Sequence, residues 1–177
     1  MANLDPLRFL IDNGKAWIVT QRATYRPQAQ SLPDAMRSRF SPFFTTGILD
    51  AARVHLIPEI QNPPFYAQLA AAGQPLPLDF RKMHGITFID TVFVATSKVA
   101  AQHYEALMFH ECVHMVQYAL LGVDQFVEQY VMGWAMNGRQ YERIPMEVEA
   151  YALQNAFTAN PGAPFSVEAA VRRRLGL

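Results

Sequence analysis

The segment from residue 101 to residue 121 constrains the fold of this chain most, because it contains neither proline nor glycine and its apolar residues recur at helical spacing. Two adjacent apolar stripes together cover about half of the helix circumference. Their members are Phe109, Val113, Val116 and Leu120, and Met108, Cys112, Met115 and Ala119. Gly122 follows as a C-terminal cap. We therefore expect a deeply buried helix that ends at Gly122.

A metal-binding motif lies on this helix, where His110-Glu111-Cys112-Val113-His114 reads His-Glu-x-x-His. Residues four apart lie one turn apart on the same face of a helix, so two imidazoles can share one ion beside the carboxylate. A catalytic zinc ion usually has three protein ligands and leaves one position for water. The pattern predicts metal-assisted hydrolysis with His110 and His114 as ligands. The plainer alternative is two histidines that only form hydrogen bonds.

The third ligand must come from elsewhere in the chain, and residues 144–151 are the best source. Pro145 suits the first position of a helix, and the small Ala150 would let that helix approach the motif closely. We predict Glu147 as the ligand, with complementation of the helix N-terminus as its alternative role. Glu149 points to the other side of this helix, so it is expected at the surface or as an outer partner, a residue that orients a metal ligand without binding the metal itself.

Apolar periodicity and turn residues predict the other elements. Helices are expected at residues 4–11 (stopped by Asn13-Gly14), 34–40, 65–72, 124–136, 145–159 and 166–175, and strands at 48–57 and 86–94. The arginines at 172–174 should form a solvated helix end. These elements predict an α+β fold, and 177 residues suit a single domain. Within that domain, residues 84–158 would form the metal-site core, whereas residues 1–80 have no assigned role.

Composition argues against several kinds of partner and location. Fifteen Lys plus Arg offset fifteen Asp plus Glu, so no long-range field would gather nucleic acid or anionic lipid. The longest apolar stretches fall short of the ~18 to 20 residues of a membrane span, and charged residues interrupt the first 14 residues where a secretory signal would be apolar. The single cysteine, Cys112, fits a reducing compartment. We expect a cytoplasmic protein by default, with non-classical export left open, and no nucleic-acid or membrane partner.

The motif and its distant glutamate together resemble a known class of enzymes. His110-Glu111-Cys112-Val113-His114-Met115-Val116-Gln117, followed by Pro145-Met146-Glu147-Val148-Glu149-Ala150, is similar to the gluzincin branch of the zincin metallopeptidases. The similarity is greatest to small bacterial zincin-like domains with His-Glu-x-x-His-x-x-Gln and a later Pro-x-Glu-x-Glu-Ala. It covers roughly residues 84–158 of the chain.

This resemblance implies a zinc-dependent peptidase. His110, His114 and Glu147 would be the zinc ligands, and Glu111 the general base that takes a proton from an acidified water. A small antiparallel or mixed sheet would place residues 86–94 as an edge strand on the buried helix, where a peptide or protein substrate could pair with it. Tyr151 departs from the pattern, since related gluzincins often have aspartate there.

Several alternatives stay open from the sequence. The donor to the oxyanion could be His103, Tyr130, Tyr141 or Tyr151, and we list Tyr151 and His103 as catalytic candidates. The domain could also be a catalytically inactive zinc-binding scaffold or interaction module, or half of a di-iron bundle, for which a second Glu-x-x-His is missing. A side chain from residues 32–44 or from the proline-rich loops could fill the fourth metal position. Oligomeric state and cleavage preference are not determined.

Overall fold

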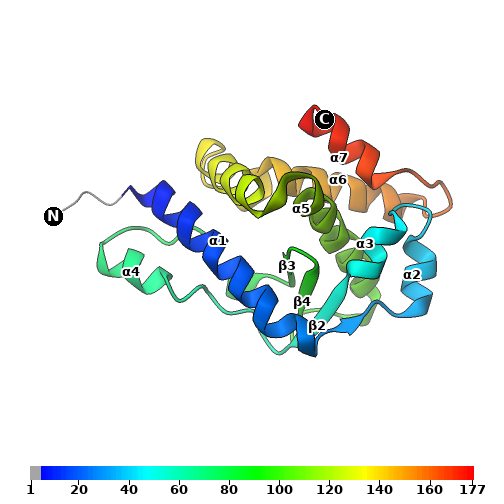
Figure 1. The fold of residues 1–177 in the computed structure, drawn as a ribbon, viewed down its shortest axis with the longest axis horizontal. Helices are drawn as coiled ribbons and strands as arrows, with labels where there is room; N and C mark the ends of the chain where they lie inside the picture. The colour runs from blue at the N-terminus through cyan, green and yellow to red at the C-terminus, as the bar shows by residue number, and fades with distance from the viewer. Residues whose placement is uncertain (1–4) are drawn as a thin grey trace.

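The structure is a computed structural model that describes residues 5–177, and Leu4 of the first expected helix lies outside this range. The helices are α1 (Pro6–Tyr25), α2 (Asp34–Phe40), α3 (Thr46–Ala51), α4 (Tyr66–Ala71), α5 (Ala101–Met136), α6 (Pro145–Ala159) and α7 (Val167–Leu175). The strands are β1 (Gln30–Ser31), β2 (Arg53–Ile57), β3 (Gly85–Phe88) and β4 (Thr91–Ala95). Figure 1 shows this α+β arrangement, in which α6 and α7 lie beside α5.

The strands form one mixed sheet in the order β1-β2-β4-β3. β2 and β4 are parallel, with Arg53 opposite Thr91, whereas β1–β2 and β3–β4 are antiparallel. Every residue of β4 is buried, as expected for a strand paired on both sides. The expected small mixed sheet is therefore confirmed, and β3 lies at its edge beside α5.

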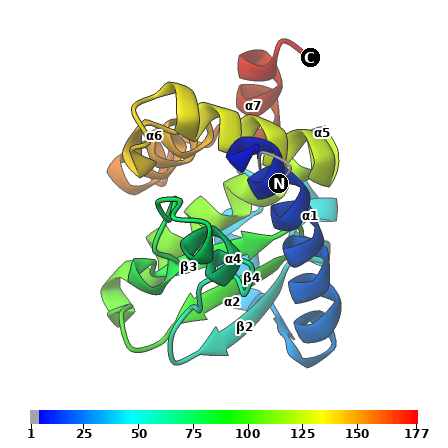
Figure 2. The same cartoon turned by 90° about the vertical axis from the view of Figure 1, so that its left-hand side faces the viewer.

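Helices cover both faces of the sheet, and each face has its own core. Val92 and Val94 of β4 face the first core, which includes the first part of α5, α2, α3, α6 and α7. Phe93 and Phe88 face the second core, which contains α1, α4 and the second part of α5. Trp17 of α1 packs edge-on against Phe88 at a centroid distance of 4.9 Å. Figure 2 shows α1 running beside the strands.

Helix α5 is interrupted at Gly122, as its position in the sequence predicts. Gly122 has φ 70° and ψ 169°, which no helix contains, so α5 consists of two helical parts on either side of it. Its most apolar stretch is long and apolar enough to span a membrane, but 61% of that stretch is buried inside the protein. Packing in the two cores accounts for this apolar character.

Helix α1 is longer than the sequence predicts, because Gly14 does not end it. Asp5 begins the helix by accepting hydrogen bonds from the backbone N–H of Leu7 and Arg8. A Cβ atom at Gly14 would lie 3.4 Å from Cγ1 of Val127 on α5. The glycine therefore serves a close crossing of two helices inside α1, and the helix continues to Tyr25.

The single strand expected at residues 86–94 is wrong, because the chain reverses at Ile89 and Asp90 to form the β3–β4 hairpin. Ile89 adopts φ 65°, which is unusual for a β-branched residue. Arg22 of α1 binds both carboxylate oxygens of Asp90, at 2.9 and 2.7 Å, and Arg26 contacts it at 3.0 Å. The turn is thus held by α1. Likewise, the strand expected at 48–57 begins only at Arg53, after α3.

We expect Gly133→Ala to destabilise the protein. A Cβ atom at Gly133 would lie 2.7 Å from Cδ of Pro145, whose ring cannot rotate away. Overpacking of this kind costs about 1 to 3 kcal/mol, which exceeds the ~1 kcal/mol by which alanine is favoured over glycine inside a helix. Gly47→Ala in α3 is the control, because no atom lies within 4 Å of its Cβ position. Urea denaturation that gave equal free energies of unfolding for the two variants would contradict this packing.

Candidate metal centre

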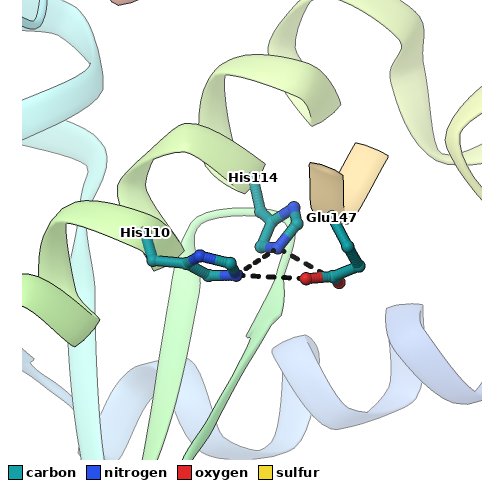
Figure 3. Close-up of side chains that lie close together, drawn as sticks. All are labelled: His110, His114 and Glu147. Atoms are coloured by element: carbon teal, nitrogen blue, oxygen red, sulfur yellow. Dashed lines mark hydrogen bonds and ion pairs between the residues drawn. The ribbon is translucent and has the colours of Figure 1, made fainter. Parts of the chain in front are cut away.

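Three buried side chains converge at the junction of α5 and α6. His110 and His114 project from the first part of α5, and Glu147 projects from the first turn of α6, as Figure 3 shows. Their exposed fractions are 3%, 5% and 2%. One ligand atom from each lies within 4.8 Å of the others, and within residues 5–177 this is the group of side chains that could hold a metal ion.

The distances in this triad fit a single tetrahedral ion. Nε2 of His110 lies 3.1 Å from Nε2 of His114, and the carboxylate oxygens of Glu147 lie 3.2 Å from the first and 3.3 Å from the second. Ligands bound to zinc at about 2.0 to 2.1 Å in a tetrahedron are separated from each other by about 3.3 to 3.4 Å. Glu147 meets His110 through Oε2 and His114 through Oε1, so both carboxylate oxygens face the imidazole nitrogens that would bind an ion.

The hydrogen bonds around His114 orient its ring so that the lone pair of Nε2 faces the other two members of the triad. Nδ1 of His114 lies 2.8 Å from Oε1 of Gln117. Nε2 of Gln117 donates to the backbone oxygen of Met146 at 3.1 Å and to Glu149 at 2.9 Å. The amide orientation makes Oε1 the acceptor, so Nδ1 of His114 carries the proton and Nε2 is free to bind a cation.

The electrostatics of the triad favour a cation as well. Burial disfavours the charged imidazolium of His114 and so lowers its pKa. The nearby carboxylate of Glu147 has a larger, opposite effect, and the pKa of His114 is raised to about 9. Burial likewise disfavours the charged form of Glu147, but the two imidazoles hold the pKa of its carboxyl well below the usual range. A carboxylate and two imidazoles that face one another therefore attract either a proton or a metal ion.

Two tyrosines hold Glu147 in place. Tyr130 on the second part of α5 donates to Oε1 at 2.7 Å, and Tyr141, just before α6, donates to Oε2 at 2.8 Å. Burial and the charge of Glu147 raise the pKa of both hydroxyls, so they stay protonated and remain donors. These two tyrosines were candidate oxyanion donors from the sequence, and the structure places them on the ligand carboxylate.

Glu111 lies beside the triad in a close-fitting environment. Its carboxylate is 3% exposed and accepts a hydrogen bond of 2.6 Å from the hydroxyl of Thr87 on β3. A Cβ atom at Gly85 would lie 2.6 Å from Oε1 of Glu111, so a side chain at this position would displace the carboxylate from where it lies. Burial raises the pKa of Glu111, although the two nearby imidazoles oppose this shift.

A chain of hydrogen bonds connects the triad to the C-terminal helix. Glu149 and Gln117 are both buried, and the amide of Gln117 donates a hydrogen bond to the carboxylate of Glu149. Arg174 of α7 donates to the same oxygen of Glu149 at 3.2 Å. Glu149 is thus an outer partner of His114, one of the two roles that the sequence left open. Arg174, expected in a solvated helix end, instead reaches Glu149.

The site opens into two cavities that meet at Glu111. The outer cleft has a volume of about 950 Å³, and its lining includes His103, His110 and Tyr151. The inner cavity has a volume of about 120 Å³, and its lining includes His114 and Glu147. Both cavities are lined by Leu78, Met83, Gly85, Glu111 and Tyr141. Residues 32–44 line neither cavity.

The two catalytic candidates from the sequence lie on the outer side of the triad. The ring of Tyr151 packs at 4.4 Å from that of His110 and is 40% exposed, whereas His103 is exposed and lies outside the triad. The sequence did not identify three residues that contact the site. They are Thr87, which binds Glu111, Gly85, which leaves space beside Glu111, and Arg174, which binds Glu149. A threonine within a strand and a glycine before it carry no local signal of such contacts.

We expect Glu147→Ala to lower the affinity for Zn²⁺ by more than about 100-fold, beyond the 10- to 100-fold typical of outer partners of a metal ligand. The variant removes one of three converging ligand atoms. Glu142→Ala is the matched control, because this exposed carboxylate lines the outer cleft but is not part of the triad. Isothermal titration calorimetry measures both affinities, and equal values for Glu147→Ala and the native protein would refute the triad as a ligand set.

Gln117→Leu should lower the Zn²⁺ affinity by about 10- to 100-fold, because Nδ1 of His114 loses the acceptor that orients its ring. Gln125→Leu, an exposed position on the same helix, should leave the affinity unchanged. Circular dichroism checks that both variants are folded before calorimetry. An unchanged affinity in folded Gln117→Leu would show that the amide does not position the ligand.

Comparisons of the chain with protein-family models, curated proteins and solved structures gave no match. The relation to zincins that the motif suggests therefore rests on the residues of this site alone.

Proposed function

We propose that this protein is a zinc-dependent metallopeptidase of the gluzincin type, in which His110, His114 and Glu147 bind the metal and Glu111 is the general base. The observation that carries this proposal is the position of Glu111. Its buried carboxylate lies next to a metal-ligand triad, at the point where an open cleft meets an inner cavity. A metal site that served stability alone would have no need of this group.

Zinc is the metal that we propose for the triad. Two imidazole nitrogens and one carboxylate are the ligands of catalytic zinc in several peptidases, and three protein ligands leave one position open. Zinc in such a site acts as a Lewis acid and makes a bound water acidic near neutral pH. Within residues 5–177, no second group of metal-ligating side chains accompanies the triad, so a di-iron centre has no support.

Glu111 is suited to accept the proton of the attacking water. A general base works best when its pKa lies close to the working pH, and burial moves the pKa of Glu111 upward in that direction. Thr87 binds Oε2, so Oε1 is the oxygen left for water. Gly85 keeps the backbone of β3 close to this oxygen without a side chain in the way.

The outer cleft suits an extended peptide. It lies between the first part of α5 and the start of β3, and β3 has a free edge because it is the last strand of the sheet. An extended substrate can pair with such an edge and be held along its backbone. We assign Tyr151 and His103, which line this cleft, as the candidates that donate to the oxyanion during hydrolysis.

A zinc-binding scaffold without activity is the alternative function. Such a scaffold would use the triad to bind zinc, but the buried carboxylate of Glu111 next to the triad would then have no role. An unused buried carboxylate is unfavourable, so Glu111 argues against this alternative.

We expect Glu111→Gln to lower kcat/KM for casein or peptide hydrolysis by about 10²- to 10⁴-fold, the usual contribution of a general base. The amide has the same shape and can still bind Thr87, so zinc content should be unchanged. Glu128→Gln, an exposed position on α5, is the matched control and should have native activity.

Zinc content of each sample is measured alongside activity by atomic absorption. Equal activity of Glu111→Gln and the native protein at equal zinc content would overturn the proposed role of Glu111. A native protein that binds zinc but hydrolyses no peptide would favour the scaffold.

A further inference from the structure

Helix α7 turns one of its three terminal arginines towards α6. Val167, Val171 and Arg174 are spaced i, i+4 and i+7, so they lie on one face of the helix. Both valines are fully buried in the first core, which presses this face against the rest of the molecule. Of the other two arginines, Arg172 forms an ion pair within its own helix and Arg173 is exposed. The packing of α7 therefore places Arg174, and not its neighbours, beside α6.

Arg174 compensates the charge of a buried carboxylate. The side chain of Glu149 is 7% exposed, and Nη1 of Arg174 lies 3.2 Å from its Oε2. Within residues 5–177, no other lysine, arginine or histidine forms an ion pair with Glu149. A buried carboxylate that loses its cation is strongly disfavoured. Without Arg174, the side chain of Glu149 would turn towards water.

The same oxygen of Glu149 holds the amide that orients a metal ligand. Gln117 is fully buried, and its amide nitrogen donates to Glu149 and to the backbone oxygen of Met146. With both amide hydrogens used, the amide oxygen faces Nδ1 of His114. If Glu149 turned away, a buried donor would lose its acceptor, and the amide would rotate to recover one. Three hydrogen bonds in series thus connect Arg174 to His114.

Within residues 5–177, the other histidine of the triad has no comparable support. Nδ1 of His110 is buried there without a hydrogen-bond partner, and the ring of His110 packs against that of Tyr151. A partner on the second ring nitrogen fixes the orientation of a metal-binding histidine and raises its basicity. The two histidines therefore differ, because a hydrogen-bonded chain that ends on α7 orients His114 alone.

We propose that Arg174 is a positioning residue for the metal centre, which acts on His114 through Glu149 and Gln117. The inference deepens the proposed function and rests on its metal triad, but not on its reaction. It makes α7 part of the metal site, although α7 lies outside residues 84–158, which carry the zincin-like motif.

Isothermal titration calorimetry with Zn²⁺ compares Arg174→Gln with Arg173→Gln, which removes the same charge from the same helix end. Arg174→Gln should lower the affinity by about 3- to 10-fold, less than the 10- to 100-fold typical of a direct partner of a ligand. Arg173→Gln should have the native affinity. Arg174→Lys should recover most of the loss, since an ammonium group can still pair with Glu149. Arg174→Met keeps the apolar stem of the side chain and should give the same loss as Arg174→Gln, which it replaces if that variant does not fold.

A double-mutant cycle with Gln117→Leu tests the route. In this background Arg174→Gln should have no further effect on the Zn²⁺ affinity, because the connection to His114 is already broken. The visible absorption of Co²⁺ bound in place of zinc reports the ligand geometry, and it should change in Arg174→Gln but not in Arg173→Gln. A purely structural role of Arg174 would lower the affinity equally in both backgrounds and leave the Co²⁺ spectrum unchanged. That result would overturn the proposal.

The outcomes separate this inference from the proposed function. A native protein that binds neither Zn²⁺ nor Co²⁺ would overturn both. Native Zn²⁺ affinity in folded Arg174→Gln would overturn the inference and leave the peptidase standing. The expected loss of affinity, in a protein that hydrolyses no peptide, would support the inference and overturn the peptidase.

Discussion

The rest of the structure depends on the burial of four polar side chains along one helix. His110, Glu111, His114 and Gln117 of α5 are each at most 5% exposed, and a buried polar group without a partner costs about 1 to 3 kcal/mol. Their partners come from other elements: Thr87 from β3, and Glu147 and Glu149 from α6. The edge of the sheet and the start of α6 are therefore held at α5 by polar contacts as well as by the apolar core.

The N-terminal part of the chain contributes to the site indirectly. Arg22 of α1 and Arg26, the residue directly after α1, hold Asp90 in the β3–β4 turn, and this hairpin carries Gly85 and Thr87 to Glu111. The same helix lines the inner cavity. Residues from this part of the chain thus contribute to both cores and to the surroundings of the site.

Local sequence signals predicted those elements whose boundaries are set by the residues within them. Gly122 interrupts α5, Pro145 begins α6, and Ser166 caps α7 by accepting from the backbone of Ala169. The β3–β4 hairpin was missed because the β-branched Ile89 is not a typical turn residue and residues 86–95 contain no glycine, proline or asparagine to mark a turn. It depends on the charges of α1, which lie more than sixty residues away in the chain. The length of α1 was missed for a similar reason, since Gly14 is explained by Val127 of α5.

The sequence by itself determined which side chains can form the triad, because the spacing of His110 and His114 on a helix has a fixed geometry and Glu147 follows a proline that begins the next helix. Only the tertiary structure decided how these groups are held and what surrounds them. Glu147 and Glu111 are held by two tyrosines and a threonine that are identified only once the elements have packed. Gln117 is three residues from His114, but Thr87 lies 24 residues from Glu111 and Tyr130 lies 17 residues from Glu147, and no local pattern encodes contacts over such separations.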